Sequence, residues 1–203
     1  MQILIATDGS PEADLAVRLG GIINQMVPGG LRLLAVIKQE AERPAAQEIL
    51  DQAALLIDSS RSVQTNIRIG QPAEEIVQEV IEGAYGLVIM GEHQRHRLTS
   101  RILTPTAIRV IDQLPCPVLI ARGEIRPLHR VLVCESGRNP SLLNRLITQL
   151  GSLLKQADEL TALHVMSQIA AGPGVPGWEL RADAEELIEK QTIEGTILED
   201  DLA

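Results

Sequence analysis

Aromatic side chains are almost absent from this sequence. Among its 203 residues there is no phenylalanine, one tyrosine and one tryptophan, although the overall hydrophobic fraction of 45% is ordinary. This composition excludes a core filled by aromatic rings. The core has to be built from leucine, isoleucine, valine and alanine instead.

Cysteine and long apolar runs are also scarce. The two cysteines, Cys116 and Cys134, each lie inside an apolar, strand-like run, so we predict two small buried side chains and no disulfide framework. No apolar run approaches the roughly 20 residues of a membrane-spanning helix, and the N-terminus enters a strand without a signal peptide. We therefore expect a soluble, cytoplasmic protein with no membrane insertion.

Positive charge is the third deficit. The chain has 18 Lys and Arg residues against 27 Asp and Glu, for a net charge of −9. Proteins that bind nucleic acid generally use basic surface to displace the counterions of the phosphate backbone. The charge balance therefore argues against a nucleic-acid partner.

One stretch of the chain begins with a buried strand and a polar segment. Residues 87–90 are continuously apolar, which is typical of a strand covered on both faces of a parallel sheet. Gly91 follows and lacks a Cβ, so we predict a turn there. Because ligands of α/β sheets bind beyond the carboxyl ends of the strands, we expect the functional site in the loop that follows Met90.

A helix and another strand complete this stretch. Thr104 has a hydroxyl that can cap a helix, and Pro105 suits the first helical position, so the pair predicts a helix start. Residues 116–121 are apolar and partly β-branched, which favours a strand.

The whole first part of the chain alternates between strand and helix patterns. We predict strands at residues 2–6, 31–37, 63–69, 87–90 and 116–121. We predict helices at residues 12–26, 44–57 and 71–83, and from residue 104. Such alternation produces right-handed crossovers and a parallel sheet with helices on both faces. The predicted fold class is α/β, with one doubly wound domain at residues 1–122.

The pattern restarts after a polar linker at residues 123–129. VLVCESG from Val131 lines up with ILIATDG from Ile3, and LTALHVM from Leu160 lines up with LRLLAVI from Leu31. Because the two matches have nearly the same offset, we interpret residues 130–203 as a partial second α/β repeat. Either the chain is a fragment, or the second unit is a degenerate half-domain that packs against the first sheet or against a partner.

The chain resembles the universal stress protein (UspA-like) family, in a tandem form with a truncated or degenerate second copy. The resemblance covers residues 1–122 and, more weakly, 130–203. It is carried by ILIATDGSPEAD, the strand pattern L-x-L-L-x-V, IRIGQPAEEIV, and LVIMGEH with RILTPTAIRVIDQLPCPVLIAR. It implies a five-stranded parallel sheet of the adenine nucleotide alpha hydrolase-like (Usp) fold. It also implies that many members pair as dimers through the last strand, and that some members bind ATP whereas others do not.

The family's nucleotide signature, G-x-x-G followed by nine residues and G-[S/T], is mostly lost here. Gly91 matches the first glycine, but the other three positions hold Gln94, Thr104 and Pro105. A phosphate in this loop needs close backbone approach and N–H donors at the helix N-terminus. The long side chain of Gln94 and the β-branch of Thr104 hinder a close approach of the backbone, and Pro105 lacks the N–H donor. We therefore expect no cofactor, with ATP or AMP as the alternative.

Three further positions match nucleoside contacts of the family. Asp8 corresponds to an acidic residue that contacts the nucleoside in binding members, and Val36 and Met90 correspond to residues on the adenine side. Each position also has a plainer interpretation. Asp8 in the sequence DGSP suits an Asx turn or a helix cap, and Val36 and Met90 suit an ordinary core.

The segment after the fourth predicted strand is locally basic. Arg95, Arg97 and Arg101 could hold an anion by side chains in place of glycine backbone. The alternative is a solvated loop whose charges pair with neighbouring acids. His93 and His96 lack a completing set of ligands, so we predict no metal site. No catalytic constellation can be assigned.

Three functions fit these features. The first is a non-catalytic stress-response or regulatory module that acts as a homodimer, with a pairing strand of Pro117, Val118, Leu119, Ile120 and Ala121. The second is an ATP- or AMP-binding protein with slow ATPase or phosphotransfer activity. The third uses the acidic second repeat to contact a protein partner. We favour the first, under which the protein is not an enzyme.

Overall fold

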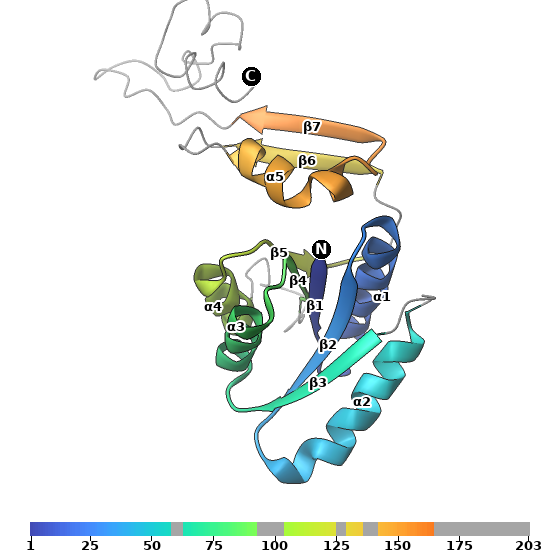
Figure 1. Cartoon of the computed structure of the whole chain (residues 1–203), viewed down its shortest axis with the longest axis vertical. Helices are drawn as coiled ribbons and strands as arrows, with labels where there is room; N and C mark the ends of the chain where they lie inside the picture. The colour runs from blue at the N-terminus through green and yellow to red at the C-terminus, as the bar shows by residue number, and fades with distance from the viewer. Residues whose placement is uncertain (58–62, 93–103, 125–128, 136–141, 165–203) are drawn as a thin grey trace, which may run out of the picture. The chain divides into compact units, whose positions relative to one another are not determined.

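The computed structural model describes residues 1–57, 63–92, 104–124, 129–135 and 142–164. The chain divides into two compact units, Met1–Pro127 and Leu128–Ala203 (Figure 1). Each unit has a sheet of its own, with five described strands in the first unit and two in the second.

The first unit is built on a parallel sheet. Its strands are β1 (Gln2–Ala6), β2 (Gly30–Ile37), β3 (Val63–Ile69), β4 (Leu87–Gly91) and β5 (Val118–Ala121). They lie in the order β3-β2-β1-β4-β5, so the strand order reverses between the neighbours β1 and β4. The predicted five-stranded, doubly wound α/β sheet is confirmed.

Helices cover both faces of this sheet. They are α1 (Pro11–Met26), the short 3₁₀ helix η1 (Glu40–Glu42), α2 (Arg43–Leu55), α3 (Pro72–Gly83) and α4 (Pro105–Gln113). α1 and α2 lie against one face, and α3 and α4 lie against the other (Figure 1). Ile5, Leu33 and Leu87 are fully buried between these layers. The core is aliphatic, as the composition predicts.

Two predicted details of the sheet are wrong. Gly91 does not form a turn, because it is the last residue of β4. Cys116 and Pro117 precede β5 rather than belonging to it, although the Pro117 carbonyl accepts a hydrogen bond of 3.0 Å from the Val88 amide. Proline has no N–H to donate to a strand ladder, so regular pairing starts one residue later.

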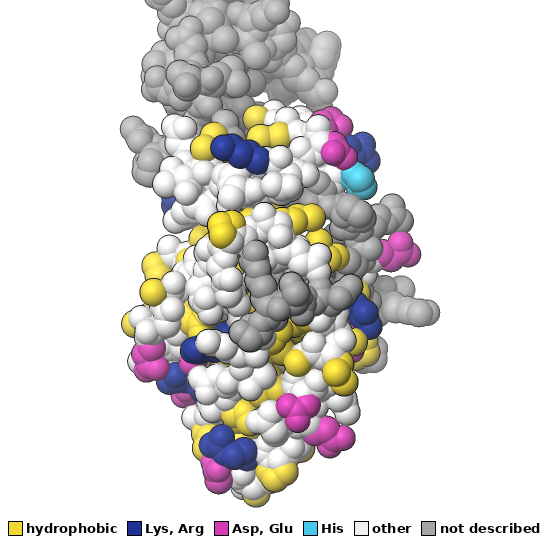
Figure 2. Space-filling view, turned by 45° about the vertical axis from the view of Figure 1, so that its right-hand side comes forward, with side chains coloured by type: hydrophobic (Ala, Val, Ile, Leu, Met, Phe, Trp, Pro, Cys, Tyr) yellow, Lys and Arg dark blue, Asp and Glu magenta, His cyan; other side chains and the backbone are white. Residues whose placement is uncertain are grey.

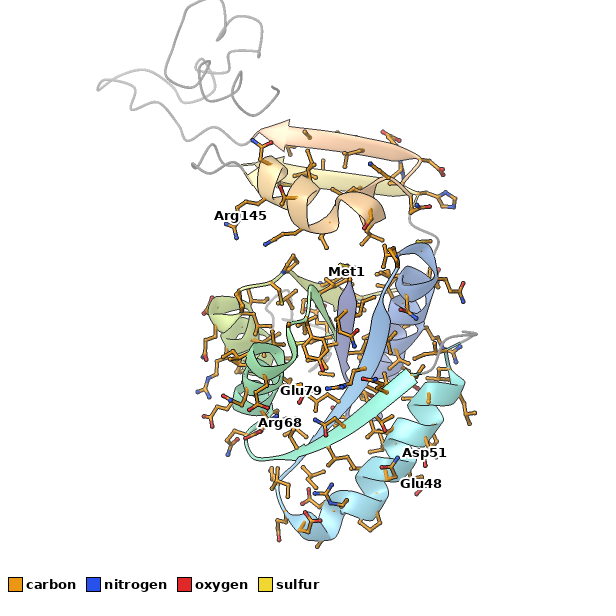
Figure 3. All side chains as sticks on the ribbon, in the orientation of Figure 1. Met1, Glu48, Asp51, Arg68, Glu79 and Arg145 are labelled. Atoms are coloured by element: carbon orange, nitrogen blue, oxygen red, sulfur yellow. The ribbon has the colours of Figure 1, made fainter. Side chains whose placement is uncertain are left out.

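A buried carboxylate ties α3 to the strands beneath it. Glu79 is 3% exposed and accepts hydrogen bonds from Tyr85 and Asn66, both at 2.8 Å, and from Arg32 at 3.0 Å and Arg68 at 3.2 Å. Figure 3 shows Glu79 on α3 directed toward Arg68 on β3. Burial opposes the charge of Glu79, but these hydrogen bonds outweigh it and lower the pKa of the carboxyl.

Tyr85, the only tyrosine of the chain, reports on this carboxylate. Burial and the hydrogen bond to Glu79 raise the pKa of Tyr85 from 10.0 to about 12. We expect the phenolate absorbance of the folded protein to titrate near pH 12. Because the pKa of Tyr85 is higher in the folded than in the unfolded protein, its hydroxyl contributes its full share of the stability below pH 10. This contribution, about 3 kcal/mol, is lost as the pH rises to about 12.

Urea unfolding at a series of alkaline pH values would measure this decline. The variant Tyr85→Phe should show a flatter pH dependence, since it has no phenol to ionise. A tyrosine that titrates near pH 10 while the protein is still folded would contradict a buried Tyr85–Glu79 pair.

The second unit contains a strand–helix–strand motif within its described residues. Its elements are β6 (Arg130–Glu135), α5 (Leu142–Leu154) and β7 (Glu159–His164). The strands are parallel, and Val131 pairs with Leu160 as Ile3 pairs with Leu31 in the first unit. The next pairs along β6 and β7, up to Cys134 with Leu163, correspond in the same way to successive pairs of β1 and β2. The pairing of β6 with β7 therefore agrees with the alignment of the two segments in the sequence.

One face of this two-stranded sheet is exposed. Val133 is 3% exposed, whereas Leu132 and Leu163 are 59% and 48% exposed. Cys134 alternates with Val133 along β6 and is exposed as well, so its predicted burial is wrong. The described part of the unit supplies a single helix, which can cover only one face of a sheet. Cys116, in the first unit, is partly buried against the core.

Candidate functional site

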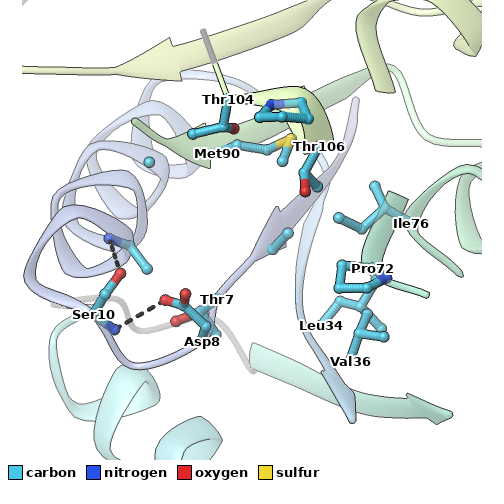
Figure 4. Close-up of a pocket in the computed structure, with 14 residues that line it drawn as sticks. Thr7, Asp8, Ser10, Leu34, Val36, Pro72, Ile76, Met90, Thr104 and Thr106 are labelled. Atoms are coloured by element: carbon cyan, nitrogen blue, oxygen red, sulfur yellow. Dashed lines mark hydrogen bonds between the residues drawn. The ribbon is translucent and has the colours of Figure 1, made fainter. Parts of the chain in front are cut away.

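A pocket lies where β1, β2 and β4 end and where α1, α3 and α4 begin (Figure 4). Its volume of about 390 Å³ is within the range of small-molecule sites. Five of the six residues that the resemblance assigns to nucleotide binding line it, namely Asp8, Val36, Met90, Gly91 and Thr104. Outside the described residues lie the sixth, Gln94, and the anion-binding candidates Arg95, Arg97 and Arg101.

The sequence did not single out the rest of the lining as a site. Apart from Pro105, which belongs to the signature, these residues have small polar or aliphatic side chains and lie in or after the strands and in the first turns of the helices: Ala6, Thr7, Ser10, Ala13, Leu34, Pro72, Ile76 and Thr106. Figure 4 shows a polar side around Asp8 and an aliphatic side around Val36. The helix-start motifs DGSP and QPAEE were the available signal, because both begin at the carboxyl end of a strand.

Asp8 forms the predicted Asx turn and also lines the pocket. Its Oδ1 accepts a hydrogen bond of 3.0 Å from the Ser10 amide. Gly9 between them has a φ of 75°, which glycine adopts without strain. Ser10 then caps α1 by accepting a hydrogen bond of 3.2 Å from the Ala13 amide. The turn fixes the Asp8 carboxylate, which has no second partner in the part of the chain that the structure describes.

The start of α4 is closed to a ligand. The Thr104 hydroxyl accepts a hydrogen bond of 3.3 Å from the Ala107 amide, and the Thr104 carbonyl accepts one of 3.0 Å from the Ile108 amide. Pro105 has no N–H. Of the first four positions of the helix, only Thr106 keeps an N–H without an acceptor among the described residues. The predicted cap at Thr104 is confirmed.

Gly91 lets the end of β4 pass close to the first turn of α1. A Cβ on Gly91 would lie 2.7 Å from the amide nitrogen of Ala13 and closer still to the carbonyl of Glu12. Backbone atoms cannot swing aside as a side chain can, so a larger residue would push β4 and α1 apart. Gly91 is therefore needed for packing, whether or not a phosphate binds nearby.

Met90 and Val36 serve the core and the pocket at once. Met90 is 7% exposed and belongs to the hydrophobic cluster that α3 and α4 cover, and Val36 packs against the same cluster. Asp8 is the only ionisable side chain among the described lining residues. The site thus combines an aliphatic wall with a single negative charge.

The described ranges hold no candidate metal site and no helix that could cross a membrane. They contain no group of three or more His, Cys, Asp or Glu side chains that could hold a metal ion. None of the described helices combines the length and apolarity that a bilayer crossing requires. On the face shown in Figure 2, acidic and basic side chains lie near one another, and the coloured residues form no extended patch of one sign.

The chain matches known proteins in sequence. The sequence model of the Universal stress protein family matches residues 1–122. Universal stress protein E of Photorhabdus laumondii is 28% identical over 109 residues, which cover 51% of this chain and 35% of the relative. The match therefore spans about a third of the length of that relative.

Solved structures share the fold. A universal stress protein from Archaeoglobus fulgidus DSM 4304 has a TM-score of 0.59 and 15% identity, covering 82% of this chain and 78% of that chain. A universal stress protein from Archaeoglobus fulgidus in complex with dAMP has a TM-score of 0.50 and 18% identity, covering 60% of this chain and 98% of that chain. At these identities the likeness shows the fold alone.

Proposed function

The chain belongs to the universal stress protein family, and on that premise we propose that it is a non-catalytic regulatory module of the stress response whose pocket does not hold ATP. The closed start of α4 carries this proposal. The Thr104 hydroxyl occupies the Ala107 amide, one of the donors that a phosphate would need, and Pro105 removes another, so only the Thr106 N–H remains among the described residues of this helix start. The module then acts through dimerisation or through protein partners rather than through nucleotide turnover.

The proposed dimer forms through β5. This strand ends the sheet order and pairs with β4 alone among the described strands. Val118, Leu119 and Ile120 are half-buried, and their outer backbone edge is of the kind that accepts another strand. A second copy of the chain, related by a two-fold axis, would supply that strand.

We propose that the second unit is a partial copy of the first and that it serves as a contact surface for a protein partner. The shared register of β6–β7 and β1–β2 supports the copy. The exposed Leu132 and Leu163 support the contact surface, because such side chains are normally covered. The acidic stretch after residue 178 lies outside the described residues.

A second candidate function is nucleotide binding with slow ATPase or phosphotransfer activity. It is favoured by the pocket itself and by the dAMP complex of a protein that shares the fold. It would require Arg95, Arg97 and Arg101 to hold the phosphates, since the start of α4 cannot. Loss of ATP binding on mutating these arginines would identify this case.

Calorimetric titration with Mg²⁺-ATP, combined with sedimentation, tests the proposed function. We expect no heat at millimolar ATP and a particle of twice the 22.0 kDa chain mass, with or without ATP. AMP serves as a second ligand with fewer phosphates. Heat at micromolar ATP would refute the proposal and favour nucleotide binding.

The reverse substitutions test why ATP is excluded. The triple variant Gln94→Gly, Thr104→Gly, Pro105→Ser restores the missing signature and frees N–H donors at α4, so it should gain measurable ATP affinity. The single variant Gln94→Gly is the control, because it leaves the helix start closed and should gain none. A silent triple variant would mean that the pocket differs from a phosphate site in more than these three residues.

A further inference from the structure

The exposed face of the β6–β7 sheet has a buried counterpart in the first unit. Because β6 and β7 pair in the register of β1 and β2, Leu132 corresponds to Leu4, and Leu163 corresponds to Leu34. Leu4 and Leu34 are fully buried, whereas Leu132 and Leu163 are 59% and 48% exposed. Cys134 lies on the same face, pairs with Leu163 and is exposed as well. We call Leu132, Cys134 and Leu163 the open face.

The other face of this sheet is largely closed by α5. Val133 is 3% exposed there, and Leu150 and Leu153 of α5 are 9% and 4% exposed. At the edge of this closed face Leu160 remains 46% exposed. Since two leucines are exposed on the open face and one on the α5 side, covering the open face would bury more apolar surface and would stabilise the unit more.

In the first unit, α3 covers the face that corresponds to the open face. Ala73 and Ile76 of α3 lie in one hydrophobic cluster with the two buried leucines of β1 and β2. The sequence AEEIV at residues 73–77 of α3 has a close match later in the chain, AEELI at residues 184–188. A segment that resembles the cover of the first sheet is therefore available to the second.

The sequence around this match predicts an amphipathic helix. The apolar residues follow the spacing i, i+4, i+7, i+8, namely Leu180, Ala184, Leu187 and Ile188. Acids such as Glu186 and Glu189 fall on the opposite side of such a helix. Residues 180–191 lie outside the described residues, so this helix is a prediction from the sequence.

We infer that residues 180–191 cover the open face as α3 covers its counterpart, and that they thereby regulate the contact surface of the second unit. The inference rests on the proposed role of this unit and adds its control: a protein partner reaches the open face only when the segment leaves it. Burial of Leu132 and Leu163 under the apolar side of the segment supplies the driving force.

Disulfide trapping in the full chain tests where the segment lies. Under mild oxidation, Leu187→Cys should form an intrachain disulfide with the native Cys134, because both would lie at the covered face. The matched control is Glu189→Cys, on the opposite side of the predicted helix. It should cross-link at least about tenfold more slowly, because a disulfide requires Cα atoms within about 7 Å. A Cys116→Ser background leaves Cys134 as the sole native thiol.

A labelled peptide of residues 180–203 tests the regulation. The full-length double variant Leu187→Asp, Ile188→Asp loses the apolar side of its own segment, so it should bind the peptide at least about tenfold more tightly than the parent does. Adding Leu163→Asp should abolish this gain. Adding Ile147→Asp should not, since Ile147 is 52% exposed on α5 and lies outside the open face. Circular dichroism like that of the parent would show that each variant is folded.

Three results would overturn the inference. Cross-linking of Leu187→Cys to an added Leu160→Cys, in preference to Cys134, would place the segment beside α5, as α2 lies beside α1. Disulfides between two chains would assign the open face to a second copy. Equal peptide binding by the parent and the double variant would remove the regulation. All three would leave the proposed function standing, which fails instead if ATP binds at micromolar concentration.

Discussion

Replacing Glu79 with alanine is expected to lower the free energy of unfolding of the first unit by about 3 kcal/mol. The substitution leaves two guanidinium groups, those of Arg32 and Arg68, without the carboxylate that lies between them. It also leaves the Tyr85 hydroxyl without its acceptor. The loss stays moderate because the Arg32 and Arg68 side chains are 32% and 20% exposed and can regain water. Urea unfolding followed by circular dichroism measures it.

Glu82→Ala is the matched control for this prediction. Glu82 lies on the same helix and pairs with the same Arg68 at 2.8 Å, but its side chain is 53% exposed, so solvent already screens the pair. We expect a much smaller loss from Glu82→Ala. Equal losses from the two variants would show that burial of Glu79 adds nothing to the network.

The effect of Glu79→Ala should also depend on pH. The pKa of Glu79 is lowered below the ordinary 4.5, so its contribution to stability is present above pH 4.5 and is lost as the pH falls through the folded pKa. The difference between parent and variant should therefore narrow in acid. Unfolding midpoints measured from neutral to acid pH would check this.

Replacing Gly91 with alanine is the second substitution with a large expected effect, a loss of about 3 kcal/mol. The new methyl group would meet the backbone of Glu12 and Ala13 at the first turn of α1, and no rotamer change relieves that contact. Because β4 and α1 would have to separate, we also expect the pocket to lose affinity for any ligand. Thermal and urea unfolding would measure the loss of stability, and titration with AMP and Mg²⁺-ATP, each compared with the parent chain, would measure the affinity of the pocket.

Gly151→Ala is the control for Gly91→Ala. A Cβ on Gly151 would meet nothing closer than 4.0 Å, and Gly151 lies within α5, where alanine is the better helix former. This variant should be as stable as the parent or more stable. If Gly91→Ala were equally harmless, the close approach of β4 to α1 would not be a constraint on the fold.

The pattern of apolar residues was sufficient to predict the sheet. Strands such as 2–6 and 63–69 were predicted with the bounds that the structure has, because each is a short β-rich run between turn residues. The turn predicted at Gly91 was wrong because a glycine after an apolar run can serve either of two purposes. It can form a turn, or it can allow another segment of backbone to pack closely against the strand. Only the packing of α1 against β4 distinguishes them.

The Glu79 network could not be predicted from the sequence. Glu79 is one of several acids in a helix whose partners lie on β2, on β3 and at Tyr85, and no local pattern marks it as the buried one. The pocket was partly predictable. The resemblance indicated Asp8 and Met90, whereas Thr7 and Thr106 line it only because strand ends and helix starts converge there.

The seam between β1 and β4 has a consequence for how the first unit assembles. Ile3 pairs with Leu87, so the contact between β1 and β4 closes a long loop of chain that holds two further strands and three α-helices. Because closing a long loop costs chain entropy, we expect this contact to form late in folding. The pocket straddles this seam, since Asp8 follows β1 and Met90 lies in β4. A bound molecule would therefore join the contacts that form last, and would slow unfolding as well as raise equilibrium stability.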